Sequence, residues 1–247
     1  MALLTLTSPD GVRLAVERTG SGPPLVLVGG AGGDRRAWDA VVPFLGDEFT
    51  VYALDRRGRG GSGDRAGSEV ADEVADVVAT AVAAGGDAVV AGHSSGALLA
   101  LRAAAVRPDV VRRVVAYEPP SVVTAGVAQR LRALVDAGDL DGALTSFRTE
   151  AVGMPADVVA SMRKTPQWQE DLTLAHTTAY DAAIVEAGLP EVSVPARFVL
   201  GGASPARMAD GVRHYAARLG AQVRVLDGQQ HFAQRTAPRE LAAVIAS

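Results

Sequence analysis

The fold of this chain is decided by the stretch Ala88-Val89-Val90-Ala91-Gly92-His93-Ser94-Ser95-Gly96-Ala97-Leu98-Leu99-Ala100-Leu101. Its apolar beginning predicts a buried strand, and its Ala- and Leu-rich end predicts a helix. Between them the pattern Gly-x-Ser-x-Gly centres on Ser94. A strand, this pentapeptide and a helix form the context of a nucleophile elbow, in which glycines let the two backbones pass closely and a sharp turn exposes the serine hydroxyl. The stretch therefore predicts an α/β fold with Ser94 as nucleophile.

Composition limits the classes of function. The 247 residues suffice for one α/β domain with a large core, and 48% of them are hydrophobic. A net charge of −4 argues against nucleic-acid binding. The absence of cysteine excludes disulfides, thiol nucleophiles and cysteine-ligated metals. The apolar segments are short, and Met1–Thr7 lacks the basic region of a signal peptide, so we expect a cytoplasmic protein that does not span a membrane.

The order of elements predicts a mostly parallel sheet of eight strands with helices on both faces. Residues 3–7 and 12–18, separated by the turn sequence Ser8-Pro9-Asp10-Gly11, predict an antiparallel hairpin. From Leu25 onward, apolar strands alternate with helices, which is typical of a parallel sheet. The further strands are expected at 25–28, 50–54, 88–92, 111–117, 196–200 and 222–226, and helices at about 36–45, 69–84, 95–106, 206–219 and 238–246.

The alternation stops after the sixth strand. Residues 121–190 show only helical segments, interrupted by Gly and Pro, and they are too numerous for a loop. We therefore expect a core made of residues 1–120 and 191–247, with a helical insertion at 121–190.

Four motifs carry a resemblance to a known family. A glycine-rich loop, a segment after the next strand, the Ser94 elbow and a late histidine appear in a characteristic order: Gly29-Gly30-Ala31-Gly32-Gly33, Asp55-Arg56-Arg57-Gly58-Arg59-Gly60-Gly61-Ser62, Gly92–Gly96 and Gln230-His231-Phe232. With these motifs the chain resembles the α/β-hydrolase fold over essentially its whole length. The resemblance implies that the first loop lines an oxyanion hole and that the insertion is a cap.

His231 is the predicted general base. A serine hydroxyl needs a base that removes its proton during attack, and imidazole titrates near neutral pH and can return that proton to the leaving group. His231 follows the last strand, which is where the fold places this residue. His93 adjoins Ser94 but is expected to point away from it, while His176 falls in the insertion and His214 in a surface helix.

Two backbone N–H groups are the predicted oxyanion donors. The elbow supplies that of Ser95, and the resemblance implies that of Ala31. The loop departs from the family pattern because Gly29 stands where histidine is common. That histidine usually braces the loop, but the backbone donors do not depend on it.

The acid that orients the histidine is missing from its usual place. The resemblance expects an aspartate after the seventh strand, where this chain has Ser204. We choose Glu118, which follows the sixth strand at the carboxyl edge of the sheet, and a structural pairing of Glu118 with an arginine is the alternative. Asp210 and Asp227 remain further candidates for the acid.

The sequence thus predicts a serine hydrolase with catalytic Ser94, His231 and Glu118, and with oxyanion donors Ala31 and Ser95. We expect it to act on a small, moderately hydrophobic ester, thioester or lactone through an acyl-enzyme. No cofactor, metal, nucleic acid or membrane partner is expected, and a homodimer is compatible with the sequence. The alternative is a non-hydrolytic protein on the same fold, such as an acyltransferase, a lyase, a cyclase or a ligand-binding module.

A nucleotide-binding interpretation rests on one match. Gly58-Arg59-Gly60-Gly61-Ser62-Gly63 fits the pattern G-x-G-x-x-G after a strand. A dinucleotide site requires these glycines to open a helix directly, and polar residues intervene here. We interpret the match as coincidental.

Overall fold

A computed structural model describes residues 1–121 and 124–247 of the chain. Its centre is one eight-stranded sheet with the strand order β1-β2-β4-β3-β5-β6-β7-β8. The β1–β2 and β2–β4 pairs are antiparallel, and the other neighbouring pairs are parallel. The strands are β1 Ala2–Thr7, β2 Arg13–Gly20, β3 Pro24–Val28, β4 Thr50–Leu54, β5 Ala88–His93, β6 Val111–Tyr117, β7 Ala196–Gly201 and β8 Gln222–Leu226. The eight-stranded, mostly parallel sheet predicted from the sequence is confirmed.

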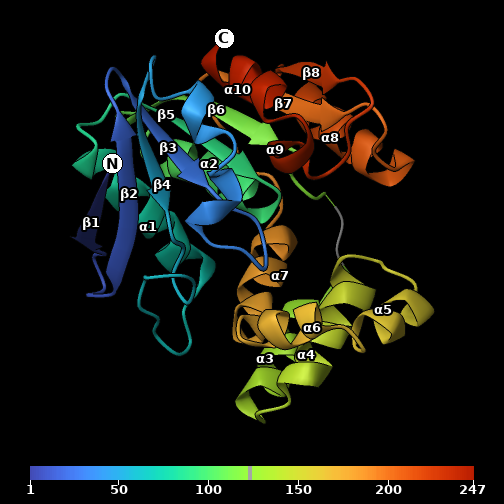
Figure 1. The fold of residues 1–247 in the computed structure, drawn as a ribbon. Helices are drawn as coiled ribbons and strands as arrows, with labels where there is room; N and C mark the ends of the chain where they lie inside the picture. The colour runs from blue at the N-terminus through green and yellow to red at the C-terminus, as the bar shows by residue number, and fades with distance from the viewer. Residues whose placement is uncertain (122–123) are drawn as a thin grey trace.

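Helices cover both faces of this sheet (Figure 1). The first face packs against α1 (Val70–Ala83), α2 (Ser95–Val106) and α8 (Ala206–Arg218). The second face packs against α10 (Pro238–Ala246), the short α9 (Ala233–Thr236) and the turns η1 (Arg35–Trp38) and η2 (Val42–Phe44). Because the central strands are covered on both faces, most of their residues are apolar and buried.

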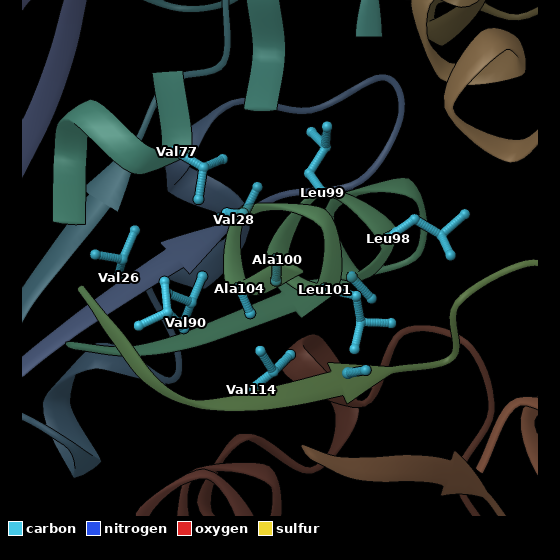
Figure 2. Packing of buried hydrophobic residues seen from close by; sticks show 14 of the residues in the cluster. Val26, Val28, Val77, Val90, Leu98, Leu99, Ala100, Leu101, Ala104 and Val114 are labelled. Atoms are coloured by element: carbon cyan, nitrogen blue, oxygen red, sulfur yellow. The ribbon is translucent and has the colours of Figure 1, made fainter. Parts of the chain in front are cut away.

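The core on the first face is made of small and branched side chains. Figure 2 shows Ala100 and Ala104 on the side of α2 that faces Val90 of the sheet, while Leu98 and Leu99 extend from other sides of the helix within the same buried cluster. Most residues of α2 are buried, so this helix, which begins beside Ser94, is fixed against the sheet over nearly its full length. The elbow is thus anchored on both its strand side and its helix side.

The predicted helix at 36–45 was wrong. The structure has two short 3₁₀ turns, η1 and η2, in that region. Pro43 explains the difference, because it has no N–H group and its ring clashes with the carbonyl of an α-helical turn before it. Trp38 of η1 is still buried under the second face of the sheet.

Between β6 and β7 the chain forms helices, as predicted. They are α3 (Val127–Asp136), α4 (Leu140–Ser146), the π-helical turn η3 (Phe147–Ala151), α5 (Ala156–Met162), α6 (Pro166–Leu172), η4 (Ala175–Thr177) and α7 (Thr178–Glu186). In Figure 1 this group stands beside the sheet, with α7 reaching toward the core. Val122 and Val123, which the sequence assigned to the start of this insertion, lie outside the described residues. None of the helices within residues 1–121 and 124–247 has the length and apolar character that a membrane crossing requires.

Candidate active site

Ser94 occupies a strained turn between β5 and α2. Its backbone angles are φ 55° and ψ −126°, which a residue with a side chain rarely adopts. A Cβ on Gly92 would lie 2.2 Å from the carbonyl oxygen of Gly96, and one on Gly96 would lie 2.4 Å from that of Gly29. Both glycines are therefore required for the backbones to pass. The Ser94 N–H donates to the carbonyl of Tyr117 on the neighbouring strand at 2.9 Å, which secures the turn.

Glu118 lies at the end of β6 and is completely buried. Its φ is 45°, so this residue is also held in a strained conformation. Its Oε1 accepts hydrogen bonds from the Gly201 N–H at 2.8 Å and from the Ser204 hydroxyl at 2.5 Å. Its Oε2 lies 2.7 Å from Nδ1 of His231. Burial raises the pKa of this carboxyl, but the hydrogen bonds from His231, Ser204 and Gly201 outweigh burial and hold the pKa below its ordinary value.

His231 is oriented by Glu118. An ionised carboxylate only accepts hydrogen bonds, so the contact assigns the ring proton to Nδ1 and leaves Nε2 as the basic nitrogen. The side chain is 28% exposed, so the ring remains accessible to small molecules. This arrangement is the one that a general base requires.

Tyr117 and His93 hold the loop that carries His231. The Tyr117 hydroxyl donates to the carbonyl of Gln230 and accepts from the Ala233 N–H at 2.9 Å. Nε2 of His93 lies 2.7 Å from the carbonyl oxygen of His231, and because a carbonyl only accepts, this nitrogen carries the proton. Burial, reinforced by the nearby His231, keeps the pKa of His93 well below its usual value, so this ring is neutral. His93 therefore helps to hold the backbone of His231 in place.

The glycine-rich loop after β3 passes directly over Ser94. A Cβ on Gly30 would lie 2.9 Å from Cβ of Ser94 and 3.1 Å from Nδ1 of His93. Ala31 follows at an exposed position. Ser95 is the first residue of α2, where an N–H group has no partner inside the helix and the helix dipole favours negative charge. The loop and the helix N-terminus thus both lie next to Ser94.

Comparison with known proteins identifies the family of the chain. The sequence model of the Alpha/beta hydrolase family matches residues 25–244. The chain belongs to this family. A crystal structure of an alpha/beta hydrolase from Sphaerobacter thermophilus superposes with a TM-score of 0.85 at 38% identity, covering 98% of each chain.

Two curated relatives of this α/β hydrolase are named as hydrolases. The 2-(acetamidomethylene)succinate hydrolase of Mesorhizobium japonicum is 33% identical over 51% of this chain, but the chain spans only 46% of that protein. The (E)-2-((N-methylformamido)methylene)succinate hydrolase of Acinetobacter baylyi is 27% identical over 90% of this chain and 88% of that protein. Family and relatives together support a hydrolase of this fold.

The other candidates for the acid lie elsewhere in this α/β hydrolase. Asp210 is exposed on α8, and Asp227 is exposed in the turn after β8. Asp55 is buried, but it accepts hydrogen bonds from the Arg35 and Gly61 N–H groups at 2.8 and 2.7 Å, which is a structural arrangement. Of the carboxylates considered, Glu118 is the one that the structure places against His231.

The structure also explains the glycine match at 58–63. Ser62 binds back to β2, since its hydroxyl accepts from the Ala15 N–H at 2.9 Å. Gly63 donates to the carbonyl of Arg13 at 2.7 Å. The segment is thus a loop tied to the hairpin, and α1 begins only at Val70.

Sequence reasoning missed two sets of residues at the site. Tyr117 directly precedes Glu118, but no short pattern marks a tyrosine that braces a loop more than a hundred residues away. Arg56 and Asp181 both form hydrogen bonds with the hydroxyl of Ser95. Arg56 belongs to a motif that the sequence did flag, whereas no signal marks Asp181.

A cavity of about 270 Å³ lies where the loop before α1 meets α3 and α7. Its lining includes Asp64, Arg132, His176 and Tyr180, and none of the candidate catalytic residues. Trp168 packs inside the insertion against Leu144 and other apolar side chains.

Proposed function

We propose that this α/β hydrolase is a serine hydrolase acting through an acyl-enzyme. The Ser94 oxygen attacks the substrate carbonyl while its proton passes to Nε2 of His231. The N–H groups of Ser95 and Ala31 stabilise the negative oxygen that forms. The proton then goes to the leaving group, and a water molecule, deprotonated by His231, releases the acid and restores Ser94.

The contact between Glu118 and His231 carries this proposal. A buried carboxylate with a lowered pKa is charged at neutral pH, so it stabilises the imidazolium that forms when His231 takes the proton. It also selects the ring tautomer in which Nε2 is basic. A purely structural role for Glu118 would not require a partly exposed histidine as its partner.

The substrate we favour is a small, moderately hydrophobic ester, thioester or lactone. Phe232, next to His231, is 53% exposed and offers an apolar surface beside the base. We further propose that residues 121–190 act as a cap over this site and that the protein works in the cytoplasm without a cofactor.

Hydrolysis of an amide bond is the second candidate. It is favoured by the two curated relatives, whose names describe succinates that carry acetamido or formamido groups. The same triad serves both bonds, since the acid step at His231 protonates an amine as readily as an alcohol leaving group.

The first test is intact-mass analysis after treatment with a fluorophosphonate. Wild type should gain one adduct, Ser94→Ala none, and His231→Ala should react far more slowly. His214→Ala, which changes an exposed histidine on α8, is the matched control and should react like wild type. Absence of an adduct on folded wild-type protein would overturn the proposal and favour a non-hydrolytic role.

A second test separates the two bond types. Wild type is assayed with p-nitrophenyl acetate and with p-nitroacetanilide, which share an acetyl group and differ in the bond cleaved. Turnover of the ester alone supports the esterase proposal, whereas a comparable kcat/KM for the anilide supports the amidase candidate. In either case Ser94→Ala should remove the activity.

A further inference from the structure

Asp181 of the insertion reaches the back of the oxyanion hole. It lies on α7 and is 2% exposed. Its Oδ1 accepts a hydrogen bond from the hydroxyl of Ser95 at 2.7 Å. Ser95 is the residue whose N–H is the elbow's oxyanion donor, so a residue of the insertion directly contacts the residue that forms one wall of the hole.

Arg56 links Ser95, on one side of the oxyanion hole, to the loop of Ala31 on the other side. Its Nη1 donates to Oδ1 of Asp181 at 2.8 Å, to the hydroxyl of Ser95 at 3.1 Å and to the carbonyl of Gly29 at 3.2 Å. Gly29 lies in the loop that carries Ala31, the second proposed donor. A single guanidinium nitrogen thus binds both sides of the hole, and Asp181 holds that nitrogen in place.

The charges in this cluster balance. Arg56 also pairs with Glu73 through two hydrogen bonds of 2.7 and 2.9 Å, and Arg59 pairs with Oδ2 of Asp181 at 2.7 Å. Burial raises the pKa of Asp181, but Arg59 and Arg56 outweigh burial and hold it below its ordinary value. Two arginines therefore face two carboxylates, and the loss of one negative charge leaves buried positive charge uncompensated.

We propose that Asp181 is a positioning residue for the oxyanion hole, acting through Ser95 and Arg56. Through these contacts the position of α7 against the core affects how well the oxyanion donors stabilise the transition state. The inference rests on the proposed function. Because α7 is part of the insertion, a substrate that shifts this helix would alter the alignment of the two donors. Preorganised donors act only when they are correctly placed, so the coupling affects kcat rather than substrate binding.

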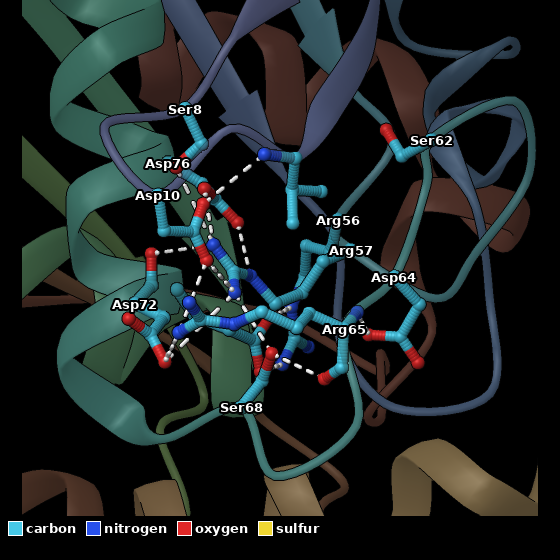
Figure 3. Close-up of polar contacts among 12 residues, drawn as sticks. Ser8, Asp10, Arg56, Arg57, Ser62, Asp64, Arg65, Ser68, Asp72 and Asp76 are labelled. Carbon is cyan, nitrogen blue, oxygen red and sulfur yellow. Dashed lines mark hydrogen bonds and ion pairs between the residues drawn. The ribbon is translucent and has the colours of Figure 1, made fainter.

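The test compares Asp181→Asn with Asp76→Asn. Asp76 is as deeply buried as Asp181 and binds Arg57 through two hydrogen bonds of 2.7 and 2.8 Å (Figure 3). Among the described residues, the hydrogen-bond partners of the Arg57 side chain are Ser8, Asp10, Ser68, Asp72 and Asp76, and they do not include Ser95 or Gly29. Each variant is measured for kcat and KM with p-nitrophenyl acetate, for thermal stability, and for affinity toward a trifluoromethyl ketone, which forms a tetrahedral adduct on the nucleophile.

Asp181→Asn should lower kcat at least about 10-fold with a nearly unchanged KM, a part of the ~10²- to 10³-fold effect of losing one oxyanion donor outright. Ketone affinity should fall by a similar factor. Asp76→Asn should lower thermal stability and leave kcat and ketone affinity unchanged. Equal losses of kcat in the two variants, or no loss in Asp181→Asn, would overturn the inference.

Ser95→Ala keeps the test decisive if Asp181→Asn fails to fold. It removes the hydroxyl and retains the backbone N–H, so it should lower kcat and ketone affinity in the same direction. In the double variant the two effects should not add, because both act through one contact. An active wild type with an unaffected Ser95→Ala would overturn this inference alone, whereas a wild type inert to the ester and to a fluorophosphonate would overturn the proposed function and this inference with it.

Discussion

The hydroxyl of Ser204 donates a hydrogen bond to Oε1 of Glu118 at 2.5 Å. Ser204 stands where the resemblance to α/β hydrolases expects the acid, after β7, and Glu118 stands after β6. The two strands are adjacent, and the Glu118 N–H donates to the carbonyl of Val199 at 3.0 Å. The carboxylate thus comes from β6, next to β7. The Ser204 hydroxyl is a hydrogen-bond donor that helps to keep the Glu118 carboxylate charged.

Replacement of the acid should impair turnover without unfolding the chain. In Glu118→Gln the amide carries no charge and presents an N–H to Nδ1 of His231, which favours the wrong ring tautomer. We expect kcat to fall, by up to ~10⁴-fold if Glu118 acts as a triad acid. Glu191→Gln, which changes a highly exposed carboxylate, should have no effect. Near-normal turnover in Glu118→Gln with an ester substrate would remove Glu118 from the mechanism.

Moving the acid back to the seventh strand should recover part of this loss. Ser204→Asp in the Glu118→Gln background restores one negative charge within the same group of side chains. We expect kcat about 10-fold or more above that of Glu118→Gln alone, since a charge beside the imidazolium is worth on the order of one pKa unit or more. In the wild-type background the same change places two carboxylates together and should lower activity. Steady-state kinetics of the three variants decide between these outcomes.

The sheet and the elbow were predictable because their signals are local. Apolar strands, turn residues and the glycines around Ser94 each act within a few positions, and the structure places β4, β6, β8 and α2 at the residues expected. The contact between Glu118 and His231 spans 113 residues. It was inferred only because parallel strands end at a common edge, where residues far apart in sequence converge.

The arrangement behind the site was not predictable in the same way. Asp181 is one of two acidic residues on α7, and its partner Arg56 lies 125 positions away. Sequence spacing does not specify how the insertion docks on the core, so a buried ion pair across that junction leaves no local pattern. The helix expected at 36–45 failed for a different reason, because apolar spacing was given more weight than Pro43.

Buried His93 should make the protein less stable in mild acid. The pKa of this ring is well below its usual value in the folded chain, whereas an unfolded histidine titrates near about 6.5. Below that pH the unfolded chain binds a proton that the folded chain does not, so the free energy of unfolding falls as the pH falls, by at most about 1.4 kcal/mol per pH unit for one site. The loss continues down to the folded pKa.

Urea unfolding at pH 7.5, 6.5 and 5.5 measures this effect. His93→Gln can still donate a hydrogen bond to the carbonyl of His231, but it does not titrate. We therefore expect its free energy of unfolding to depend less steeply on pH than that of wild type. His214→Gln, at an exposed position, should retain the wild-type slope. Parallel slopes for wild type and His93→Gln would contradict a neutral, buried His93.

The approach of the glycine-rich loop to Ser94 gives a final prediction. In Gly30→Ala the new methyl group would lie 2.9 Å from Cβ of Ser94 and 3.1 Å from Nδ1 of His93, so the loop must move away. A shift of roughly 1 Å at such a site can cost ~10²-fold in rate, and we expect kcat to fall by that order while ester binding changes little.

Gly33→Ala is the matched control, since the nearest atom to its methyl group is 3.9 Å away. Kinetics and fluorophosphonate labelling should show Gly33→Ala close to wild type and Gly30→Ala slow in both assays. A Gly30→Ala protein with normal rates would mean that the loop does not need its close approach to Ser94, and Ala31 would then lose its proposed role as oxyanion donor.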